Sequence, residues 1–219
     1  MRRYAHGLNC IGIMDNSTLF QYLIASVALT LAPGPDNLFV LSQGVAHGRR
    51  QAIITALGMC SGISVHTTAA AVGLAAVLYS SPILFSVITY CGAGYLLFIA
   101  WKTLRSSSVA EPGETVERSG RELFSRGFLM NVLNPKVGMF FVAFMPQFVS
   151  RSGQQPVMLQ MIILGIVFML QAIVIFTTIG YCSGSIGNLL VQHPRYARML
   201  SLFSAMVLVL LAGRLLITG

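Results

Sequence analysis

Charged residues are scarce in this chain of 219 residues. Asp, Glu, Lys and Arg supply 9% of the sequence, whereas they make up roughly a quarter of an ordinary soluble domain. Hydrophobic residues supply 55%, and this composition excludes a soluble globular protein. The charges are mostly basic, with 14 Lys and Arg against 6 Asp and Glu. In a membrane protein this excess reports which loops face the cytoplasm, so it does not indicate a nucleic-acid partner.

The sequence also lacks the signatures of several chemical sites. Its four cysteines show no CxxC or metal-ligand spacing, so neither a disulfide framework nor a zinc site is indicated; they are Cys10, Cys60, Cys91 and Cys182. No nucleotide-binding motif is present, which disfavours transport driven by ATP. We therefore expect no metal, no cofactor and no enzymatic activity.

Long apolar stretches dominate the sequence that remains. About 20 mostly apolar residues cross the roughly 30 Å hydrocarbon core of a bilayer. Six stretches qualify, namely Leu19–Ala46, Ala52–Tyr79, Ile83–Trp101, Gly127–Val149, Val157–Tyr181 and Met199–Ile217. A final connector is expected around QHPRYAR, Gln192–Arg198. The sequence therefore predicts an all-α, polytopic protein with six transmembrane helices in contact with membrane lipid.

A polar stretch, Lys102–Arg126, divides the six helices into two groups of three. It combines Ser, Glu, Pro and Gly with mixed charge and is predicted to be a mobile cytoplasmic loop. The two halves of the transporter domain are then residues 14–101 and 127–219. Because three is an odd number, the second half enters the membrane from the side opposite to the first. Any likeness between the halves therefore implies an inverted repeat.

Loop charges set the expected orientation. The second and fourth loops hold one basic residue, Arg151, whereas the first, third and fifth hold Arg49, Arg50, Lys102, Arg105, Arg118, Arg121, Arg126, Arg195 and Arg198. By the positive-inside rule the richer loops are cytoplasmic, and both chain ends lie outside. Arg2 and Arg3 oppose this orientation. One explanation is that translation starts at Met14, so that residues 1–13 are an N-terminal extension; a signal peptide is disfavoured because those residues contain no apolar core.

The first and fourth predicted helices are interrupted at similar places. The first carries LAPGPDN (Leu31–Asn37) and the fourth NVLNPK (Asn131–Lys136). Proline inside a helix costs about 3 kcal/mol or more and frees backbone groups that lipid cannot satisfy. Pro33, Gly34 and Pro35 are therefore predicted to break the first helix, and Pro135 the fourth. Each break would present a helix N-terminus, with Asn134 as N-cap of one, and such ends bind carboxylates.

Asp36 and Lys136 are the two charges predicted deep inside the spans. At 1.5 Å per residue, each lies roughly 14 to 15 Å from the cytoplasmic end of its span. Charges at this depth are costly and usually face a partner, the protein interior or water. The matched depth predicts a central polar site in a solvated hollow between the halves. The alternative is a buried ion pair that only locks the helices together.

Other polar residues in the spans are open to two interpretations. His66 lies about 20 Å into the second span and either relays protons or makes a structural hydrogen bond. Asn37, Asn131 and Asn134 either line the cavity or cap helices. Gly58 and Gly62 form a small-residue face for close helix packing, within one chain or in a homodimer.

The motifs LAPGPDN (Leu31–Asn37) and SQGVAHGRRQAIITALG (Ser42–Gly58) resemble the LysE/RhtB family of amino acid exporters. The likeness continues through GISVHTTAAAVGL (Gly62–Leu74), GAGYLLFIAWKTLR (Gly92–Arg105) and GFLMNVLNPKVGMFFVAFMPQFV (Gly127–Val149). The last two helices match in outline, and Ser204 to Met206 depart from the glycine that relatives often carry. The resemblance implies export of amino acids or close derivatives, driven by protons, across the inner membrane of a bacterium. Carried over by position, Pro33 to Asn37 match one family motif, and Asn131, Asn134, Pro135 and Lys136 match another.

These observations lead to one functional hypothesis and two alternatives. In the hypothesis, a zwitterionic amino acid binds near the bilayer midplane, with its carboxylate at Lys136 and its ammonium at Asp36. Protonation of Asp36 then releases the substrate. One alternative is a membrane-embedded thiol oxidoreductase, in which Cys60 and Cys91 meet. The other is a metal-ion exporter, for which the spans offer only two candidate metal ligands, Asp36 and His66.

Overall fold

The computed structural model describes residues 14–74, 81–105, 119–150 and 155–218, and the regular structure in these ranges is helical. The proposed extension, residues 1–13, lies outside the described residues, so a start at Met14 stays a prediction. The elements before the central loop are α1 (Asn16–Leu31), α2 (Pro35–His47), α3 (Arg49–Ala69), the π-helical turn η1 (Ala70–Leu74) and α5 (Pro82–Arg105). Those after it are α6 (Gly120–Val132), α7 (Pro135–Met139), the π-helical η2 (Phe140–Phe144), the short η3 (Met145–Phe148), α8 (Val157–Tyr181), α9 (Ser183–Gln192) and α10 (Pro194–Thr218).

Four described helices are long and apolar enough to cross a membrane alone: α3 with η1, α5, α8 and α10. Two further pairs qualify when taken together. The α1–α2 pair is bent by 54°, and α6 with the segment from α7 to η3 is bent by 44°. The described chain therefore has four to six candidate membrane spans, and both breaks expected from the proline motifs are present.

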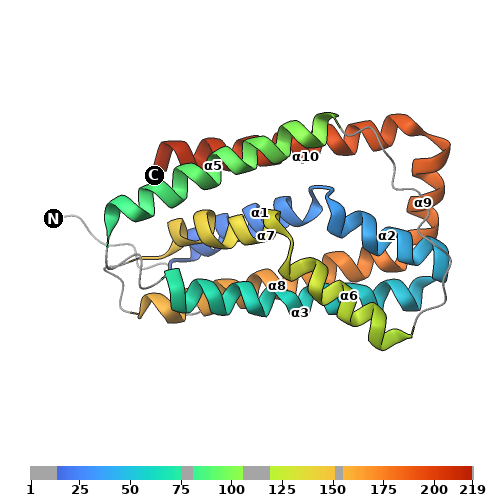
Figure 1. Ribbon diagram of the computed structural model, residues 1–219, viewed down its shortest axis with the longest axis horizontal. Coiled ribbons are helices and arrows are strands. Elements are labelled where there is room, and N and C mark those ends of the chain that lie inside the picture. Colours follow the sequence, from blue (N-terminus) through green and yellow to red (C-terminus); the bar gives the residue numbers. More distant parts are fainter. Residues whose placement is uncertain (1–13, 75–80, 106–118, 151–154, 219) are drawn as a thin grey trace.

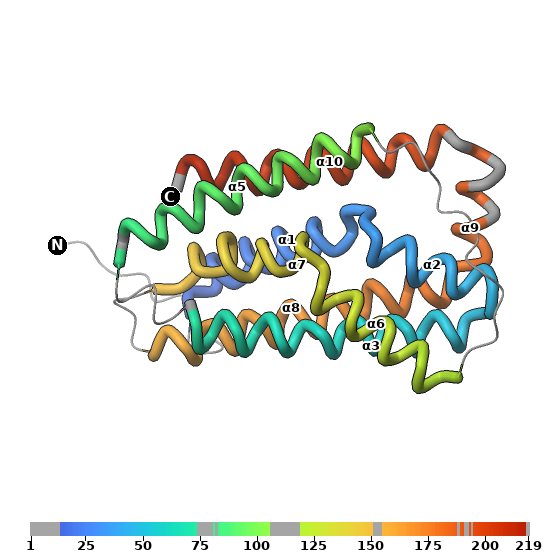
Figure 2. The backbone as a smooth tube through the Cα atoms, in the orientation of Figure 1, coloured from blue at the N-terminus to red at the C-terminus, as the bar shows by residue number. Residues whose placement is uncertain are grey.

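The helices lie roughly side by side along the long axis of the molecule (Figure 1). The α1–α2 pair, α5 and α8 run in one direction, and α3, the segment from α6 to η3, and α10 run in the other. The start of α1 and the end of α10 therefore lie at the same end, called here the N-terminal end. The short helix α9 lies across the opposite end, called here the α9 end (Figure 2).

Close packing of α3 against α6 explains the glycine face of the second predicted span. A Cβ atom at Gly58 would overlap the backbone of Phe124, and one at Gly62 would lie 2.9 Å from the Cβ of Asn131. On the facing helix, a Cβ at Gly127 would overlap the carbonyl oxygen of Thr55. The small residues thus allow two helices of one chain to approach closely. This face is used inside the chain, and it no longer supports the homodimer interpretation.

Three boundaries differ from those predicted. The polar stretch 102–126 is helical at both ends, because α5 continues to Arg105 and α6 begins at Gly120; residues 106–118 lie outside the described residues. The expected connector Gln192–Arg198 is mostly helix, since α10 already begins at Pro194. Proline at the first position of a helix costs no backbone hydrogen bond. The helix α9 was not predicted at all.

Large apolar side chains cover the outer faces of several helices. Leu170 on α8 is 57% exposed and Leu210 on α10 is 65% exposed. In water such a surface would be unusual, but in a multi-pass membrane protein it is the surface that meets lipid.

Candidate functional site

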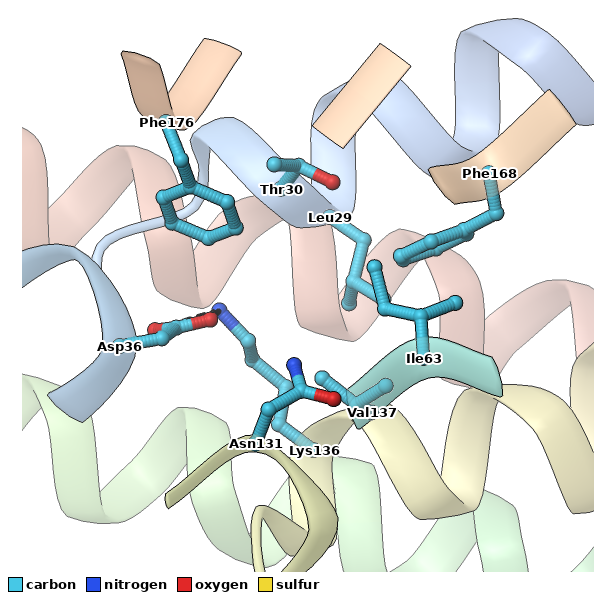
Figure 3. Close-up of a pocket in the computed structure, with 9 residues that line it drawn as sticks. All are labelled: Leu29, Thr30, Asp36, Ile63, Asn131, Lys136, Val137, Phe168 and Phe176. Atoms are coloured by element: carbon cyan, nitrogen blue, oxygen red, sulfur yellow. Dashed lines mark hydrogen bonds and ion pairs between the residues drawn. The ribbon is translucent and has the colours of Figure 1, made fainter. Parts of the chain in front are cut away.

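A small hollow lies where the two helix breaks meet, in the middle of the bundle (Figure 3). Its volume is about 10 Å³, which is close to the space that one water molecule needs. It is lined by Leu29, Thr30, Asp36, Ile63, Asn131, Lys136, Val137, Phe168 and Phe176. The solvated hollow expected from the sequence is therefore small, because protein side chains fill most of the space between the two breaks.

Asp36 and Lys136 meet directly in this hollow. The ammonium nitrogen of Lys136 lies 3.0 Å from Oδ2 of Asp36 and 3.2 Å from Oδ1. Both side chains are almost fully buried, at 4% and 3% exposure for Lys136 and Asp36. Each residue is the second of the helix that follows its break, α2 for Asp36 and α7 for Lys136. The pair therefore joins the two halves of the chain at their breaks.

Lys136 also spans the first break. Its ammonium donates a hydrogen bond to the carbonyl oxygen of Ala32, at 3.0 Å, just beyond the end of α1. The carbonyl end of a helix carries partial negative charge and the amide end partial positive charge. The cation thus lies at the carbonyl end of α1, and Asp36 lies in the first turn of α2. Both charges are placed favourably with respect to the helices of the first half.

Two more side chains satisfy carbonyls that the first break frees. Asn37 donates from Nδ2 to the carbonyl of Thr30 at 3.1 Å, and Ser204 on α10 donates to the carbonyl of Pro33 at 2.9 Å. Ser204 is fully buried, and in the sequence it appeared only as a departure from a family glycine. Its role was missed because its partner lies 171 residues away.

Gly34 is required by the close approach of these charges. A Cβ atom at this position would lie 2.6 Å from Oδ1 of Asp36 and 3.0 Å from the ammonium of Lys136. Any side chain would therefore push the ion pair apart. The adjacent prolines end α1 and begin α2, since Pro35 occupies the first position of that helix.

The second break is held mainly by local contacts. Asn134 is the N-cap of α7 and accepts a hydrogen bond from the backbone nitrogen of Lys136 at 3.0 Å, as the sequence predicted. Asn131 accepts a hydrogen bond on its carbonyl oxygen from the backbone of Asn134 at 2.9 Å. The Nε2 of His66 lies 3.0 Å from the same carbonyl oxygen. His66 thus contacts the backbone of the break, and among the described residues it is not part of the lining of the hollow.

Several buried oxygen atoms near the hollow have no hydrogen-bond partner within the described part of the chain. They belong to Asn37, Asn131 and Gln171. Gln171 on α8 donates from Nε2 to the hydroxyl of Thr30 at 2.9 Å, which leaves its own oxygen spare. Buried polar atoms are normally paired, so these acceptors are suited to a ligand that brings N–H or O–H donors. Thr30 was not singled out from the sequence, whereas Gln171 is a polar residue in a strongly apolar helix, a pattern typical of groups that add polar contacts or tie helices together.

The rest of the lining is apolar. It consists of aliphatic side chains from three helices together with Phe168 and Phe176 from α8. Figure 3 shows the two rings on the same side of the hollow, with Phe176 nearer Asp36 and Phe168 nearer Ile63. The site therefore combines one cation, one anion and spare acceptors with an apolar wall, a set of groups complementary to a small zwitterion with an apolar side chain.

The alternative chemistries find little support in the described residues. Cys60, Cys91 and Cys182 are free, with Cys60 buried and Cys91 exposed. No group of three His, Cys, Asp or Glu side chains is placed to share a metal ion in the described ranges. Among the described residues, neither a disulfide nor a group of three metal ligands therefore accompanies the two broken helices.

Comparison with known proteins places the chain among membrane transport proteins. Residues 27–219 match the family described as LysE type translocator. The chain is 33% identical over 144 residues to a leucine efflux protein of Klebsiella pneumoniae, covering 62% of this chain and 65% of that protein. It is 30% identical over 165 residues to a homoserine/homoserine lactone efflux protein of Salmonella typhimurium, covering 75% and 78%. An uncharacterised membrane protein of Bacillus subtilis is 29% identical over 174 residues. No solved structure matches the chain.

Proposed function

Because the chain belongs to the LysE type translocator family, we propose that it is a secondary transporter that exports amino acids or close derivatives across the bacterial inner membrane. It is a member of a transporter family and not an enzyme. Leucine and homoserine are the first substrates to test, since relatives over most of the chain are named for their efflux. The apolar wall of the hollow favours a substrate with an aliphatic side chain.

The proposed architecture has six spans, with each bent pair counted as one. The helix directions in Figure 1 fit two inverted repeats of three spans, with the breaks in the first span of each half. The α9 end faces the cytoplasm in this proposal. Its support is the cluster of basic residues at the helix ends there, namely Arg49, Arg50, Lys102, Arg105, Arg121, Arg126, Arg195 and Arg198.

The ion pair between Asp36 and Lys136 carries the proposed mechanism. In the closed structure the two charges neutralise each other, at 3.0 Å. A zwitterion would enter by exchange: its carboxylate replaces Asp36 at the Lys136 ammonium, and its ammonium replaces Lys136 at the Asp36 carboxylate. Both the empty and the loaded site are then electrically neutral. This matters because a net charge at the centre of a bilayer is costly.

Coupling to protons follows from the same exchange. A proton taken up by Asp36 neutralises the carboxylate that holds the substrate ammonium, so the substrate is released. After the proton leaves, Asp36 pairs with Lys136 again. The two halves rock around this site so that it opens to one side of the membrane at a time.

Transport into everted membrane vesicles tests the proposal. Vesicles that contain the protein should accumulate radiolabelled leucine or homoserine when their lumen is made acidic, and Asp36→Asn should abolish this proton-driven uptake. A matched control is Glu122→Gln, which removes the carboxylate of an exposed pair with Arg126 at 3.1 Å and should leave uptake unchanged. Proton-driven uptake that survives in Asp36→Asn would contradict the assignment.

The double variant Asp36→Asn with Lys136→Gln separates transport from a purely structural lock. If the pair only holds the helices together, a neutral hydrogen-bonded pair should restore both stability and transport. If the pair is the substrate site, it should restore stability while uptake stays lost.

A further inference from the structure

A single face of α2 leads from the ion pair to the α9 end of the molecule. Asp36, Val40, Gln43 and His47 are spaced by four, three and four residues, so they share one side of the helix. Asp36 is 2% exposed, Val40 0% and Gln43 6%. By the helical rise, Gln43 lies roughly 10 Å and His47 roughly 16 Å from the level of Asp36.

Polar atoms gather along the last part of this face without hydrogen-bond partners. The Oε1 atoms of Gln43 and Gln51, both ring nitrogens of His47 and the hydroxyl of Ser183 are buried and unpaired within the described ranges. Gln43 and Ser183 are more than nine-tenths buried as whole residues. A buried polar atom without a hydrogen-bond partner destabilises a fold. Their concentration in one region indicates groups that hydrogen-bond something other than the chain.

The fold brings these residues together from three elements. Gln51 lies in the first turn of α3, directly after the corner that follows His47. Ser183 begins α9, and its hydroxyl is so close to Gly44 that a Cβ atom there would overlap it. Ala52 lies against the same glycine, at 3.1 Å from that Cβ position. The start of α9 therefore covers the polar end of the α2 face.

The opposite side of the ion pair is closed by aromatic rings. Beyond Lys136 toward the N-terminal end, the buried rings of Tyr22, Phe140, Phe144 and Phe148 pack with centroids 5.1 to 5.8 Å apart. All four are at most 3% exposed. The two sides therefore differ in packing. Rings fill the N-terminal side, where the hydroxyl of Tyr22 and the side-chain amide of Gln147 are also buried and unpaired within the described ranges. The α9 side holds five such polar atoms, separated from the ion pair by Val40.

We propose that the face of α2 from Gln43 to His47, with Gln51 and Ser183, is the water-filled entry path by which an amino acid reaches Asp36. The unpaired atoms are mostly hydrogen-bond acceptors or groups that can accept, and none carries a fixed charge. They suit water and the ammonium end of a zwitterion. Val40 is the apolar barrier between this path and the central site. The identity of the molecule that travels here rests on the proposed export function, whereas the existence of a hydrated path does not.

Thiol labelling of single-cysteine variants tests the path. In a full-length protein with its four cysteines replaced by serine, Gln43→Cys places a thiol on the path, and Val45→Cys is the matched control. Val45 lies at nearly the same depth, on the side of α2 opposite to Gln43. It is 48% exposed and contacts α9 at Gly187. A charged, membrane-impermeant methanethiosulfonate reacts only with the thiolate, which needs water.

We expect Gln43→Cys to react about 100-fold faster than Val45→Cys in everted vesicles, since lipid suppresses thiolate formation. It should not react in right-side-out vesicles. Ser183→Cys should behave as Gln43→Cys does, which covers the case in which one variant fails to fold. Reaction of every variant after denaturation confirms that the protein is present. The inference is overturned if both path cysteines react as slowly as Val45→Cys, or if they react only from the outside. Labelling needs no transport, so its outcome is independent of the Asp36→Asn uptake experiment.

Discussion

The two broken helices close their gaps in different ways. At the first break the carbonyls of Ala32 and Pro33 accept hydrogen bonds from Lys136 and Ser204, two residues of the other half of the chain. At the second break Asn134 caps the helix that follows it and bonds the backbone just before it. The first gap is therefore held by two distant donors beside its own Asn37, and the second largely by its own residues.

This difference assigns different tasks to the two halves. A contact from a distant side chain is lost when the halves move, and a ligand can replace it. A capped break keeps its shape during such a movement. We therefore expect the carbonyls of the first break to change their hydrogen-bond partners during transport. The second break should hold the backbone of Lys136 in a fixed position.

The largest effect on stability should come from removing Lys136. Lys136→Gln leaves the Asp36 carboxylate buried without its cation and removes a donor to Ala32. Loss of one partner of a buried pair typically costs about 3 to 5 kcal/mol. Unfolding of the purified protein in detergent measures this loss. Adding Asp36→Asn should recover most of it, and a double variant as unstable as the single one would contradict the contribution of the pair.

A smaller loss should follow from forcing α3 away from the helix that carries the second break. In Gly58→Ala the new methyl group would overlap the backbone of Phe124, which cannot move aside as a flexible side chain could. Overpacking of this kind costs about 1 to 3 kcal/mol. Gly94→Ala is the control, because a Cβ there meets no atom within 4 Å. Equal unfolding free energies for the two variants would argue against the close α3–α6 contact.

Ser204→Ala tests how far the first break depends on distant donors. The carbonyl of Pro33 then loses its hydrogen bond of 2.9 Å, and hydrogen bonds between membrane helices are worth about 1 kcal/mol. Ser204→Thr keeps the hydroxyl and serves as the comparison in the same unfolding assay. We expect Ser204→Ala also to slow uptake of amino acid, and unchanged stability and uptake would show that this donor is dispensable.

The smallest effect should appear when the local cap of the second break is altered conservatively. Asn134→Ala removes the cap on the Lys136 amide at a cost of about 1 kcal/mol, whereas Asn134→Ser should cost only about a few tenths, because serine is nearly as good an N-cap. Thermal unfolding of the two variants measures the difference. A loss with Asn134→Ser as large as with Asn134→Ala would mean that more than the cap holds this break.

Features that depend on a short stretch of sequence were predictable. Proline and a charge inside an apolar run predicted both helix breaks. The equal depth of Asp36 and Lys136 in their spans predicted that the two residues lie together. Contacts between distant helices were not predictable. Ser204 and Gln171 each have many possible partners in a bundle, and only the packing selects Pro33 and Thr30. The helix α9 was missed because SGSIGNLLVQ is rich in the small and polar residues of loops. The small size of the hollow was not predictable, because it depends on how closely side chains from several distant helices pack around it.

Amino acid binding to the purified protein tests the central claim most directly. The unfolding temperatures of the wild type and of the Asp36→Asn, Lys136→Gln double variant are measured with leucine, homoserine and the other common amino acids in turn. The account predicts that at least one of them raises the unfolding temperature of the wild type and that none raises that of the double variant, because the charges that exchange with the zwitterion are gone. An equal rise in both proteins would show that amino acids bind elsewhere and that Asp36 and Lys136 only hold the two halves together.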